Sequence, residues 1–240
     1  MCGRYTITTD QIDFILKRFT AELAPGFEGH KPRFNVSPGQ FVPAIVAKDD
    51  GKRYLTNMFW GFVPVWGEKP DGTLDYQINI RDDTIAKNKF FATHLQHQRC
   101  AFIVDSFYEW KNPPGFEHLE RGKKLPKGMK KIPHRIFLKD KQPFALAGLW
   151  RTIKTKEQTI ISAGIITTSP NEFMSGIHSR MPAILSINEL DTWFDTSMQD
   201  FSTVHKLLKP YDNKEMEAYV VNDYVNRLGF DAPACIEPAV

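Results

Sequence analysis

The sequence predicts an α+β fold: one domain built on an antiparallel, barrel-like β-sheet surrounded by helices. Segments rich in β-branched and aromatic residues fill the middle of the chain without the regular strand–helix alternation that parallel sheets require. Helical patterns are short and stand before, among and after these segments. We find no internal repeat and no low-complexity linker, so residues 1–240 are expected to form one domain.

The first half of the chain contributes two helical patterns and several strands. Residues 9–19 carry apolar side chains at helical spacing behind Thr9 or Asp10 as a cap, which predicts a helix. FVPAIVA (41–47) and part of YLTNMFWGFVPVW (54–66) are rich in β-forming residues and predict strands. TIAKNKFFATHLQHQ (84–98) is again typical of a helix.

Strand patterns continue through the second half, which ends in helices. CAFIVDSFYEW (100–110) begins as a buried strand and ends in alternation, and RIFLKD, PFALAGLW and TIISAGIITT predict three more strands. In SINELDTWF (186–194), Ser186 and Glu189 form a capping box that predicts a helix start. FSTVHKLL (201–208) is a short amphipathic helix that Pro210 should end.

The composition indicates a globular protein of a reducing compartment. Hydrophobic residues make up 42% of the chain and include 18 Phe and 5 Trp, enough for a sizeable core. No run of about 18 apolar residues predicts a membrane span, and the N-terminal residues do not resemble a secretory signal. Cys2, Cys100 and Cys235 are odd in number and scattered, which argues against a disulfide framework and favours a cytoplasmic protein.

Positive charge is concentrated in one segment. The net charge is +3, but residues 111–135 hold eight Lys or Arg against two Glu, so the other residues sum to −3. Four Pro and three Gly in the same segment indicate a loop or an insertion. Such a loop is more often simply solvated, but clustered cations also attract phosphate groups.

His94, His97 and Cys100 have a spacing that suggests a metal site. On a helix the two histidines share a face, whereas Cys100 is turned well away from them and enters a strand. No fourth ligand lies nearby in the sequence. We therefore expect structural histidines, and neither a metal nor another cofactor.

Several other polar and aromatic residues could have either a structural or a functional role. Trp66, in WGFVPVW, is either core or an exposed ring on which a base could stack. Glu109 stands between aromatic residues and is either an exposed residue of the alternation or a desolvated acid with a raised pKa. His178 and Arg180, in GIHSRMPAIL, precede an apolar strand. Each of these residues, taken singly, is more often structural than catalytic.

The N-terminal sequence MCGRYT places a cysteine directly after the start methionine. Removal of Met1 would give Cys2 a free amine and a thiol on adjacent carbons. An α-amine has a pKa of about 7.7–8.0, so its neutral fraction at pH 7 is a few hundred times that of a lysine amine. A chain that begins at Cys2 would therefore react readily with an aldehyde.

Six motifs together resemble the SRAP family of abasic-site processing proteins, which includes bacterial SOS-associated "peptidases" and eukaryotic counterparts. The motifs are MCGRY, RFNVSPGQ (33–40), WGFVPVW, NIRDDT, DSFYEW and IHSRMPAIL, in the family's order, with a fainter echo in VVNDYVN (220–226). The resemblance implies the SRAP fold, loss of Met1, and capture of abasic sites in single-stranded DNA through a thiazolidine on Cys2. It also implies DNA as partner and contact with replication-fork proteins. The sequence itself leaves the oligomeric state open, with a monomer as the default expectation, and predicts no membrane association.

The same resemblance assigns roles to single residues. Asn79 would hold the Cys2 terminus and the opened sugar, Glu109 would act as acid and base, and His178 would be the second proton-transfer group. Gly3 would let the sugar approach the backbone. The DNA-contacting positions would be Arg4, Arg81, Arg180, Trp66 and Pro38, with Asn35 and Ser37 in the motif that frames the pocket.

Two features depart from the family's pattern. Where the family commonly has N-x-R-x-E-T, this chain has Asp83 in place of Glu, which leaves open whether that carboxylate still orients Arg81. The basic insertion 111–135 is longer than in compact members, and we expect it to extend the DNA-contacting surface.

Two other functions fit the same residues. Cys2, His178 and Glu109 could form an N-terminal-nucleophile cysteine peptidase or amidase, for which self-removal of Met1 would be a minimal reaction. Alternatively, the chain could be a non-covalent single-stranded DNA-binding module in which Cys2 is incidental.

Overall fold

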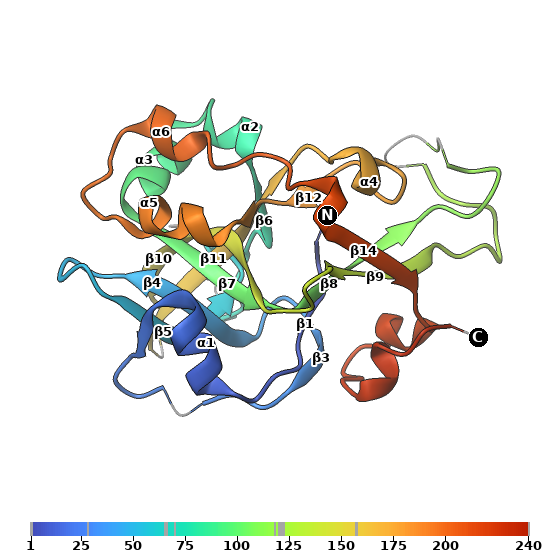
Figure 1. Cartoon of the computed structure of the whole chain (residues 1–240), viewed down its shortest axis with the longest axis horizontal. Helices are drawn as coiled ribbons and strands as arrows, with labels where there is room; N and C mark the ends of the chain where they lie inside the picture. Colours follow the sequence, from blue (N-terminus) through green and yellow to red (C-terminus); the bar gives the residue numbers. More distant parts are fainter. Residues whose placement is uncertain are drawn as a thin grey trace.

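A closed barrel of five strands forms the centre of the computed structural model (Figure 1), which describes residues 2–27, 29–64, 67–69, 71–117, 119, 123–156 and 158–239. The strands pair in the cyclic order β4–β5–β11–β10–β7 and back to β4. Their bounds are β4 (Phe41–Ala47), β5 (Arg53–Trp60), β7 (Arg99–Val104), β10 (Phe144–Lys154) and β11 (Thr159–Thr168). The predicted α+β fold with a barrel-like sheet is confirmed.

The sequence predicted an antiparallel barrel, but one pair of its strands is parallel. β5 and β11 pair in parallel, with Phe59 opposite Ser162 and Trp60 opposite Ala163, and this contact closes the ring. Short strands extend the sheet: β2 and β6 run parallel to β5 and β11, while β12 and β13 run antiparallel to β11 and β10. Their bounds are β2 (Ala21–Leu23), β6 (Asn79–Arg81), β12 (Met181–Pro182) and β13 (Ile184–Leu185).

A second, five-stranded sheet in the order β14–β9–β8–β1–β3 lies beside the barrel. Its strands are β1 (Tyr5–Ile7), β3 (Arg33–Val36), β8 (Ser106–Lys111), β9 (Ile132–Leu138) and β14 (Met216–Val220). The segment 100–110, predicted as one strand, is therefore two strands in different sheets. Asp105 separates them, because its carboxylate accepts hydrogen bonds from the hydroxyls of Thr6 and Thr8 and so turns the chain toward β1.

Short helices cover the barrel, and α3, α5 and α6 lie together on one side of it (Figure 1). The α-helices are α1 (Ile12–Phe19), α2 (Asp82–Ile85), α3 (Lys89–His97), α4 (Glu172–Ser175), α5 (Leu190–Phe194) and α6 (Phe201–His205). The 3₁₀ helices are η1 (Ile187–Glu189), η2 (Asn213–Glu215), η3 (Asp223–Asn226) and η4 (Pro233–Cys235). No helix in the described ranges is long and apolar enough to cross a membrane.

Two helix predictions in the first half of the chain need correction. The pattern over 84–98 is two helices, because the side chain of Asn88 accepts a hydrogen bond from the Phe90 N–H at 2.9 Å and starts α3 anew. Thr9 does not cap α1; its hydroxyl accepts from the Gln11 N–H before the helix begins at Ile12.

The C-terminal helices also differ from the prediction, one in helix type at its start and the other in length. The Ser186–Glu189 capping box is confirmed, but it opens the 3₁₀ turn η1 before α5. Helix α6 ends at His205, well before Pro210.

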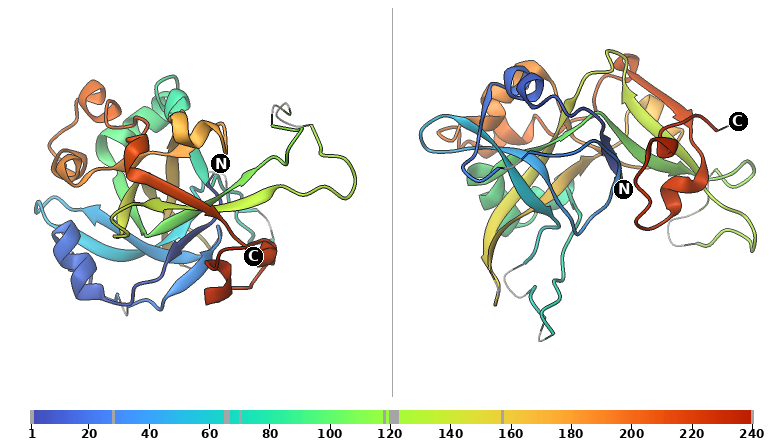
Figure 2. Two further views of the ribbon diagram at one scale, coloured as in Figure 1. Left: turned by 45° about the vertical axis from the view of Figure 1, so that its right-hand side comes forward. Right: turned by 90° about the horizontal axis from the view of Figure 1, so that it is seen from below.

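The basic insertion is the connection between β8 and β9. Its described residues form a hairpin that projects from the body of the protein (Figure 2). This hairpin carries a row of exposed lysines: Lys123, Lys124, Lys127, Lys130 and Lys131.

The aromatic motif WGFVPVW begins in the core. Trp60 is fully buried, its ring lies 4.9 Å from that of Tyr5 and 6.2 Å from that of Phe102, and its indole N–H donates to the carbonyl of Ile78 at 3.2 Å. Phe62 is buried as well. Trp66, whose interpretation was open, lies outside the described residues.

We expect Trp60→Ala to lower the free energy of unfolding by about 3–5 kcal/mol, because it would leave a large cavity between barrel and second sheet. Urea unfolding followed by circular dichroism measures this change. Phe41→Ala is the control: Phe41 is 48% exposed in the neighbouring strand β4, and its loss should cost less than about 1 kcal/mol. Equal losses in both variants would contradict the core role of Trp60.

Candidate active site

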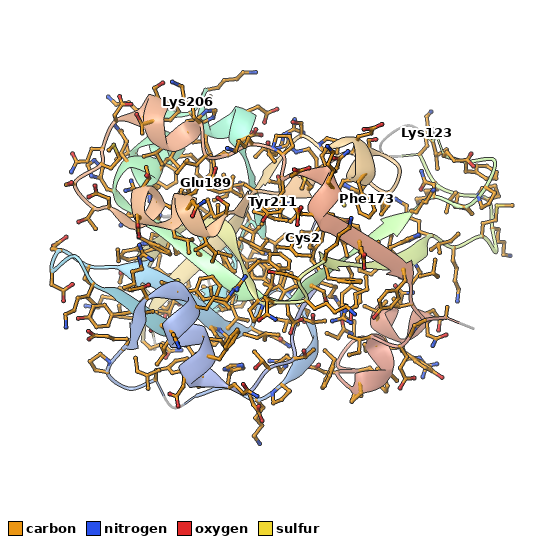
Figure 3. All side chains as sticks on the ribbon, viewed as in Figure 1. Cys2, Lys123, Phe173, Glu189, Lys206 and Tyr211 are labelled. Atoms are coloured by element: carbon orange, nitrogen blue, oxygen red, sulfur yellow. The ribbon has the colours of Figure 1, made fainter. Side chains whose placement is uncertain are left out.

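Residues from four separate segments meet beside the N-terminal end of β1. Cys2 precedes β1, Asn79 begins β6, Glu109 lies in β8, and His178 lies in the turn between α4 and β12. Figure 3 shows Cys2 at the centre of the molecule, far from Lys123 on the hairpin. The structure thus brings together residues that are up to 176 positions apart in the sequence.

Asn79 fixes the backbone at Cys2. Its Nδ2 donates a hydrogen bond to the Cys2 carbonyl at 2.9 Å. Parallel pairing of β6 with β11 places Asn79 opposite Ile165 and holds the amide in position. The Oδ1 of Asn79 is buried and accepts no hydrogen bond from the described residues, so it is an acceptor next to Cys2.

Glu109 and His178 form an acid–imidazole pair. Nε2 of His178 lies 3.8 Å from Oε2 of Glu109, and its Nδ1 lies 3.1 Å from both the backbone nitrogen and the carbonyl oxygen of Arg180. These backbone contacts fix the imidazole ring. Glu109 is only 2% exposed, and this burial raises the pKa of its carboxyl to about 6. Of its two interpretations, the desolvated acid is therefore the one that the geometry supports.

The Cys2 thiol is buried next to this pair. Its Sγ lies 3.9 Å from the carbonyl oxygen of Arg4, within reach of a weak S–H···O hydrogen bond. Burial, followed by the negative charge of Glu109, raises the pKa of the thiol. A thiolate is therefore scarce at neutral pH, and reaction at Sγ would require a neighbouring group to accept its proton.

Two of the predicted arginines are each held by a carboxylate. Asp83 accepts hydrogen bonds from Nε and Nη2 of Arg81, and these bonds lower the pKa of Asp83 to about 2. Asp83 therefore orients Arg81 although it is shorter than glutamate. Nη2 of Arg180 donates to Oδ1 of Asp82 at 2.6 Å and to the carbonyl of Thr167.

Sequence reasoning missed Asp82. The sequence does show a second carboxylate, Asp82, next to Asp83. Its partner Arg180 is 98 positions away, so no local pattern could indicate the pair.

Arg4 binds the protein itself. Its Nη1 donates to Oδ1 of Asn35 at 2.9 Å and to the carbonyl of Val225 at 3.3 Å. Asn35 in turn donates to the carbonyl of Phe230 at 2.7 Å. Arg4 and Asn35 thus connect β1 and β3 to the C-terminal segment, to which the sequence assigned no contact beyond the faint motif VVNDYVN (220–226). Contact of Arg4 with DNA stays a prediction.

Ser37 and Pro38 are half-buried in the turn after β3, and Trp66 lies outside the described residues. His94 is buried, with Nδ1 2.7 Å from the carbonyl of Phe90, whereas Cys100 is inside the barrel strand β7. In the described part of the chain, no three His, Cys, Asp or Glu side chains converge as metal ligands.

Comparison with known proteins identifies relatives over nearly the whole chain. The family model described as "SOS response associated peptidase (SRAP)" matches residues 1–228. The chain is 36% identical to the abasic site processing protein YoqW of Bacillus subtilis, covering 99% of each. It is 28% identical to the abasic site processing protein HMCES of chicken (Gallus gallus), covering 87% of this chain and 67% of that protein.

A crystal structure of a protein from Bacteroides thetaiotaomicron has the same fold. It superposes with a TM-score of 0.77 at 24% identity, and the match covers 100% of both chains.

Glu109→Gln should change how stability depends on pH. The folded protein binds the Glu109 proton more tightly than the unfolded chain, so stability falls as pH rises from about 4.5 through 6. The difference between the folded and unfolded pKa values corresponds to a loss of about 2 kcal/mol in the free energy of unfolding of the wild type over this pH range. Glutamine does not ionise, so the variant would not show this loss. Urea unfolding at pH 4.5 and 7.5 measures this effect: relative to wild type, the free energy of unfolding of the variant should be about 2 kcal/mol more favourable at pH 7.5 than at pH 4.5. If the difference between variant and wild type is the same at both pH values, the raised pKa of Glu109 is contradicted.

Proposed function

The chain belongs to the SRAP family, and we propose that it captures abasic sites in single-stranded DNA by forming a covalent bond through Cys2. The observation that carries this proposal is the convergence of Asn79, Glu109 and His178 on the one cysteine that could become an N-terminal residue. The abasic site processing relatives support DNA as the target.

The proposed reaction begins with removal of Met1 and ends in a thiazolidine. The freed α-amine of Cys2 attacks the aldehyde of the opened deoxyribose, and loss of one water gives an imine. The Cys2 sulfur then adds to the imine carbon while a proton moves from sulfur to nitrogen, which closes a five-membered ring. The ring needs amine and sulfur on adjacent carbons, which neither Cys100 nor Cys235 offers.

The neighbouring groups fit the proton transfers of this sequence. With a pKa of about 6, Glu109 exchanges protons near neutral pH and can protonate the departing hydroxyl and accept the thiol proton. His178 lies beside Glu109 and would act on the sugar hydroxyl and in reversal of the crosslink. Asn79 would hold the terminus through Nδ2 and accept from the sugar or the amine through Oδ1.

DNA phosphates would meet arginines that are already oriented. Arg81 keeps a 37% exposed side chain while Asp83 holds it, and Arg180 is held by Asp82. Guanidinium groups fixed in this way lose little side-chain entropy when they bind a phosphate.

A peptidase activity is the second candidate, and the thiol, acid and imidazole at one place are the observation that favours it. Self-removal of Met1 would be its simplest form. Cleavage of amide substrates in trans, with many turnovers per enzyme, would support a general peptidase, whereas one cleavage per chain would indicate self-processing alone.

The first test is a denaturing gel of the protein incubated with a single-stranded oligonucleotide that carries one abasic site. We expect a shifted, covalent band with wild type and none with Cys2→Ala. Cys100→Ala is the matched control, since it removes a buried thiol elsewhere and should keep the band. A band that persists in Cys2→Ala would refute the proposed linkage.

The second test is the pH dependence of the crosslinking rate. If Glu109 acts protonated and the amine acts neutral, the wild-type rate should peak near pH 7, between about 6 and 7.8. Glu109→Gln should be about 10²–10⁴-fold slower at pH 7, and its rate should rise steadily to about pH 8. A variant that keeps the bell-shaped profile would show that Glu109 is not the acid.

A further inference from the structure

A cavity lies at the base of the basic hairpin, outside the site described above. It measures about 480 Å³ and is lined by Trp110, Lys130, Lys131, Asp223, Asn226 and Arg227. We refer to it as the hairpin cavity. It joins three parts of the chain: the end of β8, the two residues before β9, and the 3₁₀ helix η3 with the residue after it.

The hairpin cavity carries a net positive charge. Three of its lining residues are cations and one, Asp223, is an anion. Asp223 lies 3.3 Å from Nζ of Lys130, but both side chains are more than half exposed, so this pair is weak. In the described part of the chain, neither Lys131 nor Arg227 has a carboxylate partner within ion-pair distance.

The walls of the cavity are held in place. The indole N–H of Trp110 donates to Oδ1 of Asn226 at 2.8 Å, which joins β8 to η3. The guanidinium of Arg227 lies 4.6 Å above the ring of Tyr224, which fixes one of its faces and leaves its N–H edge for another partner. A half-buried aromatic ring beside cations, one of them oriented, suits a nucleotide, because the ring can contact the base while the cations bind the phosphate.

The cavity is close to the candidate active site along the same strand. Trp110 follows Glu109 directly in β8, and the two side chains point to opposite faces of the second sheet. Lys131 is near enough to lower the pKa of Glu109 against the effect of burial. Figure 2 shows the hairpin projecting from the body of the protein.

We propose that the hairpin cavity binds a phosphate-bearing nucleotide of the DNA strand, on one side of the abasic site held at Cys2. This inference rests on the proposed function, and charge complementarity selects the occupant: Lys131 and Arg227 receive a phosphate, and the ring of Trp110 supports the adjoining sugar or base. The exposed lysines of the hairpin then continue the path of the strand.

The test uses an undamaged single-stranded oligonucleotide, so that affinity is measured without crosslinking. Lys131→Ala/Arg227→Ala should weaken binding about five-fold at 0.1 M salt for each phosphate that the variant no longer neutralises, and reduce the slope of log K against log[salt] by about 0.7 per phosphate. Asp223→Asn should act in the opposite direction and strengthen binding. Fluorescence anisotropy at several salt concentrations measures all three.

The control is Lys17→Ala/Lys48→Ala, which removes two exposed charges from α1 and from the turn after β4, away from the hairpin (Figure 1). Its affinity should fall less than two-fold. Equal reductions in the cavity variant and this control, or no reduction in either, would overturn the proposal.

Two outcomes separate this inference from the proposed function. A crosslink with Cys2 combined with unchanged affinity in the cavity variant would refute the hairpin cavity alone. Weakened binding in that variant without any crosslink in wild type would refute the covalent chemistry while supporting the cavity. Loss of affinity for an acidic peptide, but not for DNA, would show that the occupant is a protein and would overturn the inference.

Discussion

The site depends on how firmly the N-terminal segment is held. Chain ends are usually mobile unless they are tied into secondary structure. Here β1 pairs with both β3 and β8, and Asp105 binds the hydroxyls of Thr6 and Thr8 at the point where the chain leaves the barrel. Asn79 adds a hydrogen bond from the barrel side to the Cys2 carbonyl. Cys2 is thus held from both sheets, so a reactive terminus at this position would need no ordering step before it met a substrate.

The same arrangement explains why Glu109 is buried. β8 is the middle strand of the second sheet, and its inward face must pack against the barrel, so Phe107 and Glu109 point the same way. A carboxyl in that place costs stability at neutral pH, where an apolar side chain would not. Local features that oppose stability tend to mark functional positions, and here the cost falls on the residue that the proposed chemistry needs as an acid.

Most strands could be predicted from the sequence, because their apolar and β-branched runs are local. The closure of the barrel could not, since the contact of β5 with β11 involves two residue pairs about 100 positions apart. The break at Asp105 was equally hidden, because a polar residue inside an apolar run has meaning only once Thr6 and Thr8 lie beside it. Cys2, Asn79, Glu109 and His178 could be named in advance only through the order of six motifs together, as each residue alone has a common structural interpretation.

Charge is distributed over three regions with different proposed roles: the acid Glu109, the two carboxylate-paired arginines and the lysines of the hairpin. An unpaired arginine beside Glu109 would stabilise its carboxylate, lower its pKa and take away the proton that it should donate. Asp82 and Asp83 orient Arg180 and Arg81 and offset their positive charge. In the proposed function these arginines would bind phosphates near the lesion without placing a strong positive field at Glu109. Under the proposed function, long-range attraction of the DNA polyanion would have to come from elsewhere, and the exposed lysines of the hairpin, at a distance from Cys2, would supply it. Lys131 lies close enough to lower the pKa of Glu109. A cation closer to Glu109 would attract DNA more strongly, but it would lower this pKa further and so weaken Glu109 as a proton donor at neutral pH.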